Sequence, residues 1–282
     1  MSAFFGPGGN GDMFRAAGYK STVQAPEFVR AAGLDAYEYE AGNGLAASET
    51  TLAATGDAAR EAGIKMSFHT PYFISLSGID PEKRLKSIDY IKQSLDAAHL
   101  LGAGTIVVHS GSAAKISREE AMTLAADTLK RTLDAVDTHG VKIGLETMGK
   151  KNQLGTLDEV IELCRISPAF VPVVDFGHLN ARDCGGVFRT EEDYLRVFDR
   201  IGSALGSDIA MNLHCHFSKI EWTDSGERRH LTFEDRQYGP DFEPFMEAIY
   251  ILGASPTVIC ESAGTQAEDA LAMKKYYMSI RR

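Results

Sequence analysis

Histidine, aspartate and glutamate recur along the chain directly after short apolar runs, a pattern that could hold divalent metal ions. Imidazole and carboxylate ligands together suit zinc, manganese or iron better than magnesium or calcium, which favour all-oxygen shells. Carboxylates can also bridge two ions, so a compact set of this size could hold two or three metals. The candidate ligands are His69, His109, Glu146, Asp175, His178, His216, His230 and Glu261.

A centre with two or three metal ions is suited to the hydrolysis of phosphate esters. Such a centre generates hydroxide near neutral pH and clamps both the attacking and the leaving oxygen. A single histidine or glutamate at the end of a strand is more often a hydrogen-bonded structural group, so the prediction rests on the repetition of the pattern. By contrast, His99 and His139 fall within or beside predicted helices, and we expect both to be structural or exposed.

The apolar runs that precede these residues alternate with longer amphipathic segments, which is typical of repeated βαβ units. The starts of the runs lie roughly 25 to 45 residues apart, which leaves room for a strand, a helix and two loops. Eight strands are predicted, at residues 3–6, 36–39, 65–68, 105–108, 142–145, 171–174, 210–215 and 257–260.

Helices are predicted between these strands. Residues 81–101 carry apolar side chains at close to the helical period, and Gly102 supplies a C-terminal stop. A capping box predicts the start of a helix over residues 117–138, and residues 157–164 and 191–201 give two more. No linker interrupts the pattern. We therefore predict an α/β fold, a single-domain (β/α)8 TIM barrel over residues 1–282, with an open doubly wound sheet as the alternative.

In such barrels the chemistry lies where the strands end and the βα loops begin. The last six predicted strands each end beside a candidate ligand, so we expect one metal site at the C-terminal ends of the strands. In the seventh strand His214 and His216 share one face, because Cys215 points the other way. His214 therefore remains a further candidate ligand, with His216 nearer the rim.

Composition limits the classes of function. The formal net charge of -10 argues against a broad basic surface for nucleic acid, although it allows a local basic or metal-rich cleft. No apolar stretch approaches the roughly 20 residues of a membrane helix, and the N-terminus lacks the features of a signal peptide. The four cysteines are scattered and are expected to be reduced. We expect a cytoplasmic monomer that does not contact a membrane.

Several motifs together resemble the endonuclease IV family of apurinic/apyrimidinic endonucleases, within the wider xylose-isomerase-like barrels. They are HTPYFISL, VVHSGS, GLETMGKKNQLGT, VVDFGHLN, the strand of His216 and CESAG. The resemblance extends from His69 to Gly264 and is weak before His69. It implies a TIM barrel that binds three zinc ions, with Mn2+ as an alternative metal.

The resemblance assigns the ligands to three ions. The first would be bound by His69, His109 and Glu146, and the second would share Glu146 as a bridge. The remaining ligands of that second ion would be Asp175, His216 and Glu261.

The third ion marks a departure from the family pattern. It would require His178, His230 and an aspartate two residues before His230, where this chain has Arg228. An arginine stays protonated and does not ligate a metal. Either Glu227 or Asp224 replaces the aspartate, or the third ion is weakly bound or absent.

The implied reaction is hydrolysis of the phosphodiester on the 5′ side of an abasic site in DNA, a step of base excision repair. Glu146 and Glu261 would be the catalytic carboxylates, and the partner would be damaged double-stranded DNA. Tyr72 matches a tyrosine that the family inserts into the duplex, which bends DNA at a cost of a few kcal/mol. Lys219 and Arg228 are expected to contact phosphates, as are Lys150, Lys151 and Arg229. The loop EAGNGLAASET lacks the basic and large aromatic residues of the family's corresponding loop.

Two other functions stay open. A sugar isomerase or epimerase on the same barrel would use Glu146, Asp175, His216 and Glu261 around one Mn2+ or similar ion. The carboxylates of the fifth and eighth strands would then act as acid and base. A one-metal isomerase has no need for the four further histidines, which favours the phosphodiesterase. The third function, a non-catalytic metal or nucleic-acid binding module, fits poorly with bridging carboxylates at an open site.

Overall fold

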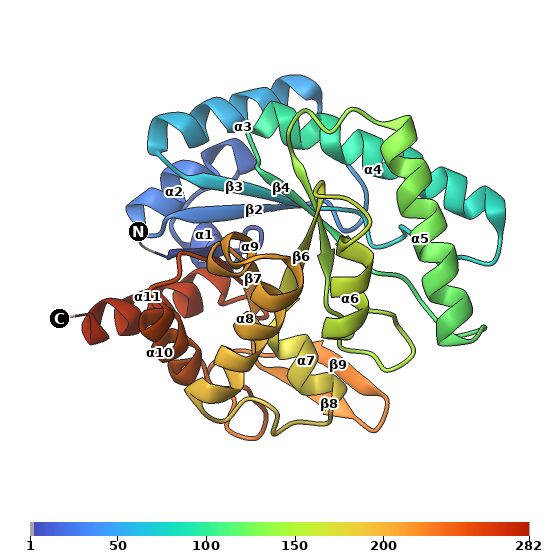
Figure 1. The fold of residues 1–282 in the computed structure, drawn as a ribbon. Helices are drawn as coiled ribbons and strands as arrows, with labels where there is room; N and C mark the ends of the chain where they lie inside the picture. The colour runs from blue at the N-terminus through green and yellow to red at the C-terminus, as the bar shows by residue number, and fades with distance from the viewer. Residues whose placement is uncertain (1–2, 282) are drawn as a thin grey trace.

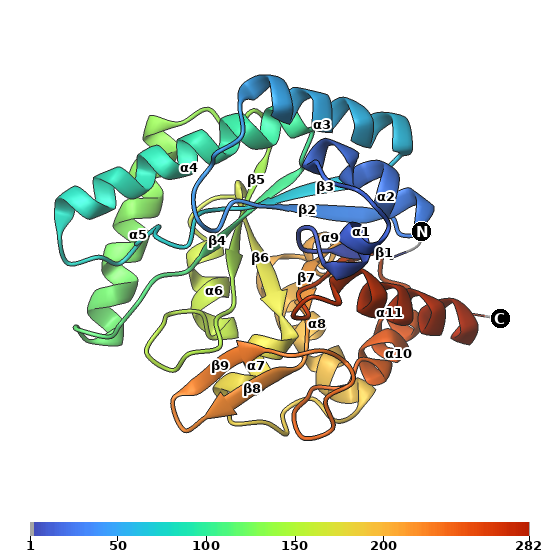
Figure 2. The same ribbon diagram turned by 180° about the vertical axis from the view of Figure 1, so that it is seen from behind.

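Eight parallel strands lie side by side and helices cover their outer face (Figures 1 and 2). The computed structural model describes residues 3–281, so residues 1, 2 and 282 of the predicted domain lie outside the described part. The strand order is β1-β10-β7-β6-β5-β4-β3-β2. The bounds are β1 (Phe4–Pro7), β2 (Ala36–Glu40), β3 (Lys65–His69), β4 (Thr105–His109), β5 (Lys142–Glu146), β6 (Phe170–Asp175), β7 (His214–Phe217) and β10 (Thr257–Cys260).

The two ends of this sheet meet, which closes the barrel. Gly8 forms a parallel bridge with Glu38, and the Asp35 N–H donates to the Phe5 carbonyl at 2.8 Å. The approach of β1 to β2 leaves no room for a side chain at Gly6, where an added Cβ would lie 1.7 Å from the Ala36 oxygen. The prediction of a closed TIM barrel, rather than an open sheet, is confirmed.

Helices follow nearly every strand, and several start where the sequence predicts. Ser117 caps α5 by accepting from the Glu120 N–H, and Gly102 ends α4 in the left-handed conformation. The helices are α1 (Asp12–Ala16), α2 (Ala25–Ala31), α3 (Glu49–Ala62), α4 (Pro81–Leu101), α5 (Arg118–Ala135), α6 (Leu157–Cys164), α7 (Phe176–Arg182), α8 (Glu191–Leu205), α9 (Ser207–Met211), α10 (Glu243–Leu252) and α11 (Gln266–Ile280), with a 3-10 turn η1 (Thr22–Gln24).

The predicted strand over residues 210–215 is wrong in its first half. Residues 207–211 form α9 after Gly206, and β7 begins only at His214, where pairing with β6 and β10 starts. A further difference is an antiparallel hairpin after β7, formed by β8 (Ile220–Thr223) and β9 (Gly226–His230), which the sequence patterns do not predict. This hairpin matters because it carries Glu227 and His230 to the barrel rim.

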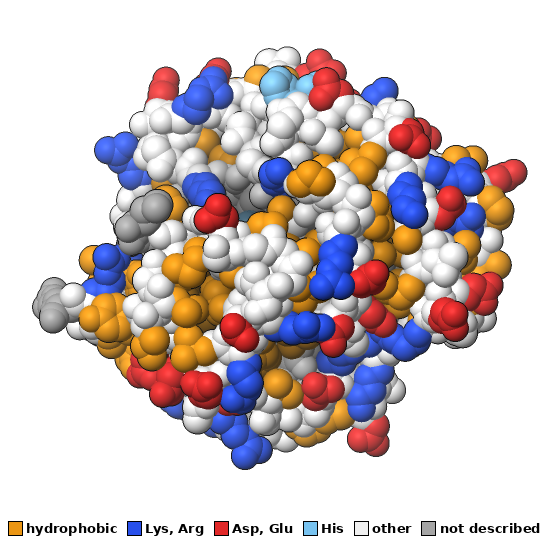
Figure 3. All heavy atoms as spheres, viewed as in Figure 1, with side chains coloured by type: hydrophobic (Ala, Val, Ile, Leu, Met, Phe, Trp, Pro, Cys, Tyr) orange, Lys and Arg blue, Asp and Glu red, His pale blue; other side chains and the backbone are white. Residues whose placement is uncertain are grey.

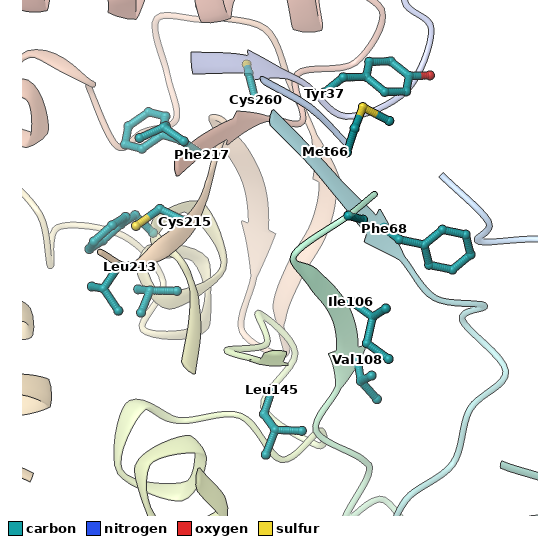
Figure 4. Packing of buried hydrophobic residues seen from close by; sticks show 14 of the residues in the cluster. Tyr37, Met66, Phe68, Ile106, Val108, Leu145, Leu213, Cys215, Phe217 and Cys260 are labelled. Atoms are coloured by element: carbon teal, nitrogen blue, oxygen red, sulfur yellow. The ribbon is translucent and has the colours of Figure 1, made fainter. Parts of the chain in front are cut away.

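The barrel strands alternate between an outer apolar face and an inner polar one. Outward-facing side chains of β3, β4 and β5, such as Phe68, Val108 and Leu145, point away from the barrel axis and are fully buried under the helices (Figure 4). The inward-facing positions of the same strands end in His69, His109 and Glu146. The period of two therefore fixes which side chains reach the interior. No helix among residues 3–281 is long and apolar enough to cross a membrane.

Glu159 ties the start of α6 to α5, and we expect its loss to destabilise the fold. Its Oε2 accepts from the Gly155 and Thr156 N–H groups at 2.9 and 3.0 Å and from Arg118 Nη2 at 2.6 Å. Glu159→Gln should lower the free energy of unfolding by about 2 kcal/mol, because charge-assisted and capping bonds are lost. Chemical denaturation of the variant and the wild type measures the difference.

The same effect should depend on pH. Burial alone would raise the pKa of Glu159, but the Arg118 guanidinium and the two backbone N–H groups lower it below 4.5. The stabilisation is therefore present above the unfolded pKa and is lost as pH falls through the lower folded pKa. A difference between wild type and Glu159→Gln that stayed constant down to strongly acidic pH would contradict this account.

Candidate metal centre

Strand register brings the predicted ligands together at one end of the barrel. His109 pairs with Glu146 across β4 and β5, and Asp175 pairs with His216 across β6 and β7. Because parallel strands in register end at the same level, side chains from distant parts of the sequence become neighbours. The structure places all eight predicted metal-ligand residues in three groups, within each of which the ligand atoms lie within 4.8 Å of one another.

Glu146 lies at the centre of these groups and is buried. Four histidines surround its carboxylate, with the nearest nitrogens of His69, His109, His178 and His216 at 3.6, 3.3, 3.4 and 3.1 Å. Its Oε2 is buried and has no hydrogen-bond partner among the described residues. A buried carboxylate oxygen that faces imidazoles and has no hydrogen-bond partner fits a metal ligand, because burial of such an oxygen is otherwise unfavourable.

Asp175, His216 and Glu261 form a second group with Glu146. His216 Nδ1 lies 3.4 Å from Glu261 Oε1, and the side chains of His216 and Asp175 are fully buried. Asp175 Oδ1 caps α7 by accepting from the His178 N–H at 2.8 Å, whereas its Oδ2 has no hydrogen-bond partner among residues 3–281. One carboxylate oxygen thus stabilises the start of α7, while the other is free to act as a ligand atom of the second group.

The third group consists of His178, Glu227 and His230. Glu227 Oε2 lies 3.5 Å from His178 Nε2, and His230 is oriented by a 2.8 Å hydrogen bond between its Nδ1 and Ser218 Oγ. Arg228 points away, with its side chain 63% exposed and paired with Glu221. Of the two replacements that the sequence left open for the expected aspartate, the structure brings Glu227 to the group.

Strand β2 contributes two glutamates that the sequence patterns did not single out. Glu38 is fully buried inside the barrel and accepts from Ser67 Oγ at 2.7 Å, while its two oxygens lie 2.9 Å from the Nε2 atoms of His214 and His216. Glu40 pairs in register with His69 at the rim. His214 does face the interior with His216, and its ring packs edge-on against the His216 ring with centroids 5.4 Å apart, but its Nε2 pairs with Glu38.

Burial and the concentration of charge shift the pKa values of the side chains in and beside the three groups. Burial raises the pKa of Asp175 to about 7 and lowers the pKa of His109 to about 4. Burial and the charges of Glu38 and Glu261 raise the pKa of Glu40 to about 8. Burial would lower the pKa of His69, but Glu40 and Glu146 raise it to about 10. Clustered shifts in opposite directions are typical of functional sites.

Each of the three groups contributes to the lining of one cavity of about 450 Å³, the second group through Glu146 and Glu261. Tyr72 forms part of its wall, where its ring stacks on His109 with centroids 5.3 Å apart and stays 55% exposed. Lys150 and Gln153 also line it, from the loop after β5. A second cavity of about 390 Å³ lies beside the first and shares Tyr72, His230 and Glu261 with it, and Glu40 also lines it.

One of the expected DNA contacts, Lys219, lies in a position that does not suit it to bind DNA. Lys219 is 6% exposed, and its amine contacts Asp241 and donates to the Asp235 carbonyl, both at 2.8 Å. This placement disfavours a phosphate contact, since the amine already has two partners. On the face seen in Figure 3, basic and acidic side chains are interspersed. His99 and His139 pack against each other with ring centroids 4.7 Å apart and ring planes tilted by 33°, and neither belongs to the three groups, as expected.

A matched pair of substitutions distinguishes the third group from its exposed neighbour. Glu227→Ala should weaken the binding of one metal equivalent at least about 10-fold, because it removes a side chain facing His178 and His230. Arg228→Ala, one residue away, should leave metal content unchanged. Equilibrium dialysis followed by elemental analysis measures both. Equal metal content in the two variants would argue against Glu227 as a ligand.

Comparison with known proteins relates this chain to one family. The sequence profile described as Xylose isomerase-like TIM barrel matches residues 26–277. An uncharacterized protein of Methanocaldococcus jannaschii is 31% identical over 173 residues, which are 61% of this chain and 62% of that protein. A probable endonuclease 4 of Acholeplasma laidlawii is 30% identical over 159 residues, 53% of this chain and 51% of that protein. The chain thus spans 51% to 62% of the length of these curated relatives.

Solved structures show the same fold at low sequence identity. A D-tagatose 3-epimerase-like protein superposes with a TM-score of 0.74 at 18% identity, covering 98% of this chain and 97% of the other. Endonuclease IV from Thermus thermophilus gives 0.68 at 19% identity, with 98% and 99% covered. The IolI protein with a bound zinc atom gives 0.70 at 20% identity, with 98% and 97% covered.

Proposed function

Because the chain belongs to the xylose-isomerase-like TIM-barrel family, we propose that it is a metal-dependent phosphodiesterase of the endonuclease IV type. Its reaction would be hydrolysis of the phosphodiester on the 5′ side of abasic sites in double-stranded DNA. The observation that supports this proposal is that three groups of side chains that could hold a metal ion each contribute to the lining of one cavity. One ion needs only one of these groups, so the excess supports two or three.

The donor set fits zinc. Each group combines imidazole nitrogen with carboxylate oxygen, and Glu146 belongs to two groups at once. The unpartnered Oε2 of Glu146 and Oδ2 of Asp175 fit ligand atoms that bind a cation. Divalent ions held here would polarise a phosphoryl oxygen and lower the pKa of water. We assign the first ion to His69, His109 and Glu146, the second to Glu146, Asp175, His216 and Glu261, and the third to His178, Glu227 and His230.

The surrounding residues would bind and orient the substrate. Tyr72 presents an exposed aromatic ring at the cavity mouth, where it could stack on a sugar or base displaced from the duplex. Lys150 lines the same cavity and is exposed, so it could contact a phosphate. Arg228 and Arg229 lie on the exposed hairpin, where they could contact the DNA backbone. Glu261 lines both cavities and would be a ligand of the second ion beside the substrate.

A second candidate function is sugar isomerisation or epimerisation with one metal ion. The likeness to a D-tagatose 3-epimerase-like protein favours it, and so does the compact group of Glu146, Asp175, His216 and Glu261. In that reaction Glu146 and Glu261 would bind the metal and also transfer a proton next to a carbonyl. This function leaves the group of His178, Glu227 and His230 without a role.

Incision of an abasic duplex tests the proposal. A labelled duplex with one tetrahydrofuran abasic analogue should be nicked on the 5′ side of the analogue, and a chelator should abolish the nick. The undamaged duplex of the same sequence is the control and should stay intact. The same preparation is analysed for metal, with two or three zinc per chain expected. One exchangeable metal ion per chain, no nick and epimerisation of a ketohexose would establish the second candidate instead.

A further inference from the structure

Two arginine side chains, Arg182 and Arg118, donate hydrogen bonds to carbonyls of the loop after β5, residues 147–155, and Arg118 reaches those of Lys151 and Gln153 at 3.0 and 3.1 Å. Arg182, at the end of α7, is 7% exposed and donates four hydrogen bonds to the loop. Its Nη1 reaches the carbonyls of Met148 and Lys150 at 3.0 and 2.8 Å, and its Nη2 reaches those of Lys151 and Gln153 at 3.3 and 3.0 Å. Arg182 therefore bonds four carbonyls of the loop, and it shares those of Lys151 and Gln153 with Arg118.

The loop in turn holds the β8–β9 hairpin through its backbone. The Glu227 N–H donates to the Gly149 carbonyl at 3.0 Å, and the Lys151 N–H donates to the Ser225 carbonyl at 3.0 Å. Lys150 forms an antiparallel bridge with Gly226. The contact is close, because a Cβ added at Gly149 would lie 2.6 Å from Glu227 Cβ and 3.1 Å from His178 Cδ2. The position of Glu227 thus depends on the position of this loop.

Arg182 and His178 lie on the same short helix, one turn apart. His178 points to Glu227 from α7, while Arg182 holds the loop to which Glu227 is bonded. We propose that Arg182 is a positioning residue that fixes Glu227 opposite His178 and so assembles the third metal group. This inference rests on the proposed function, because it assumes that metal ions bind at the strand ends.

An arginine is required for this task. Its planar guanidinium presents five N–H donors in a rigid fork, whereas a lysine ammonium is a single point of charge on a flexible stem. A lysine at position 182 could not span the four carbonyls that Arg182 contacts. The four hydrogen bonds of the Arg182 guanidinium all go to this loop, and none goes to a ligand of the other two groups. Those two groups should therefore tolerate the change.

Metal titration of Arg182→Lys tests the inference. We expect the equivalent that is weakened in Glu227→Ala to be weakened in Arg182→Lys as well, by about 10- to 100-fold. The remaining equivalents should keep their wild-type affinity. Gly149→Ala should displace Glu227 from the loop side, because the added Cβ would lie 2.6 Å from Glu227 Cβ. It should therefore weaken the binding of the same metal equivalent. Zinc competition with a chromophoric chelator gives each affinity without an activity assay.

Arg84→Ala is the matched control. Arg84 also ties a loop through backbone carbonyls, donating to Gly78 and Ile79 at 2.6 and 3.4 Å, but it does so after β3. The control should bind metal as the wild type does. If the wild type binds two or more ions and Arg182→Lys matches Arg84→Ala, the inference fails while the proposed function stands. An equal loss of every equivalent would also overturn it. A wild type that binds one ion or none overturns both.

Discussion

Replacing Glu146 by glutamine is expected to weaken metal binding and to lower kcat/KM, each by more than about 100-fold. A factor of about 100 is the upper end of the range for loss of an outer-shell partner, and Glu146 is proposed as a direct ligand. Glu146 belongs to two of the three groups, and four histidine rings surround its carboxylate within 3.6 Å. A glutamine has the same shape but offers a neutral amide, which is a poor bridge between two cations. Elemental analysis and the incision assay on the abasic duplex measure the two effects.

His230→Gln provides the comparison for Glu146→Gln. His230 belongs to one group, at the rim, and it is bonded to Ser218. Its loss should remove one metal equivalent and reduce activity less than the loss of Glu146 does. A Glu146→Gln protein that kept its full metal content and activity would show that the groups do not share a ligand.

The second large effect is expected at Glu38, below the metal groups. Glu38→Gln should lower the free energy of unfolding of the metal-free protein by about 3 kcal/mol, because it leaves the buried imidazole of His216 without one of its counter-charges. Burial would raise the pKa of Glu38, but His216 and His214 hold it well below its ordinary range, so the carboxylate is charged. The variant should also bind zinc about 10- to 100-fold more weakly, since Glu38 lies behind the ligand His216.

Ser67→Ala separates these two effects. Ser67 donates one hydrogen bond to Glu38 at 2.7 Å and carries no charge. Its loss should cost about 1 kcal/mol, the ordinary contribution of a neutral hydrogen bond. Urea denaturation of the metal-free proteins gives the stabilities. Equal losses in Ser67→Ala and Glu38→Gln would mean that the charge of Glu38 contributes little to the barrel interior.

The sequence by itself determined at which end of the barrel the candidate metal ligands lie. Side chains two residues apart in a strand point to the same face of the sheet. An apolar run followed by His69, His109 or Glu146 therefore indicates both the face and the strand end at which the candidate ligand lies. Parallel strands of one barrel share that end. Local patterns were therefore enough to predict the fold, the end of the barrel at which the eight candidate ligands gather and the interior position of His214.

Only the tertiary structure decided the roles of Glu38, Glu227 and Lys219. In the strand AYEYE the glutamates alternate with tyrosines, which locally resembles a strand with one face in water, whereas closure of the barrel encloses that face. Glu227 and Lys219 depend on the hairpin after β7, whose register no local period reveals. Burial and cross-chain contacts are properties of the assembled fold, and for this reason the sequence identified the candidate ligands on the strands but not the groups that support them.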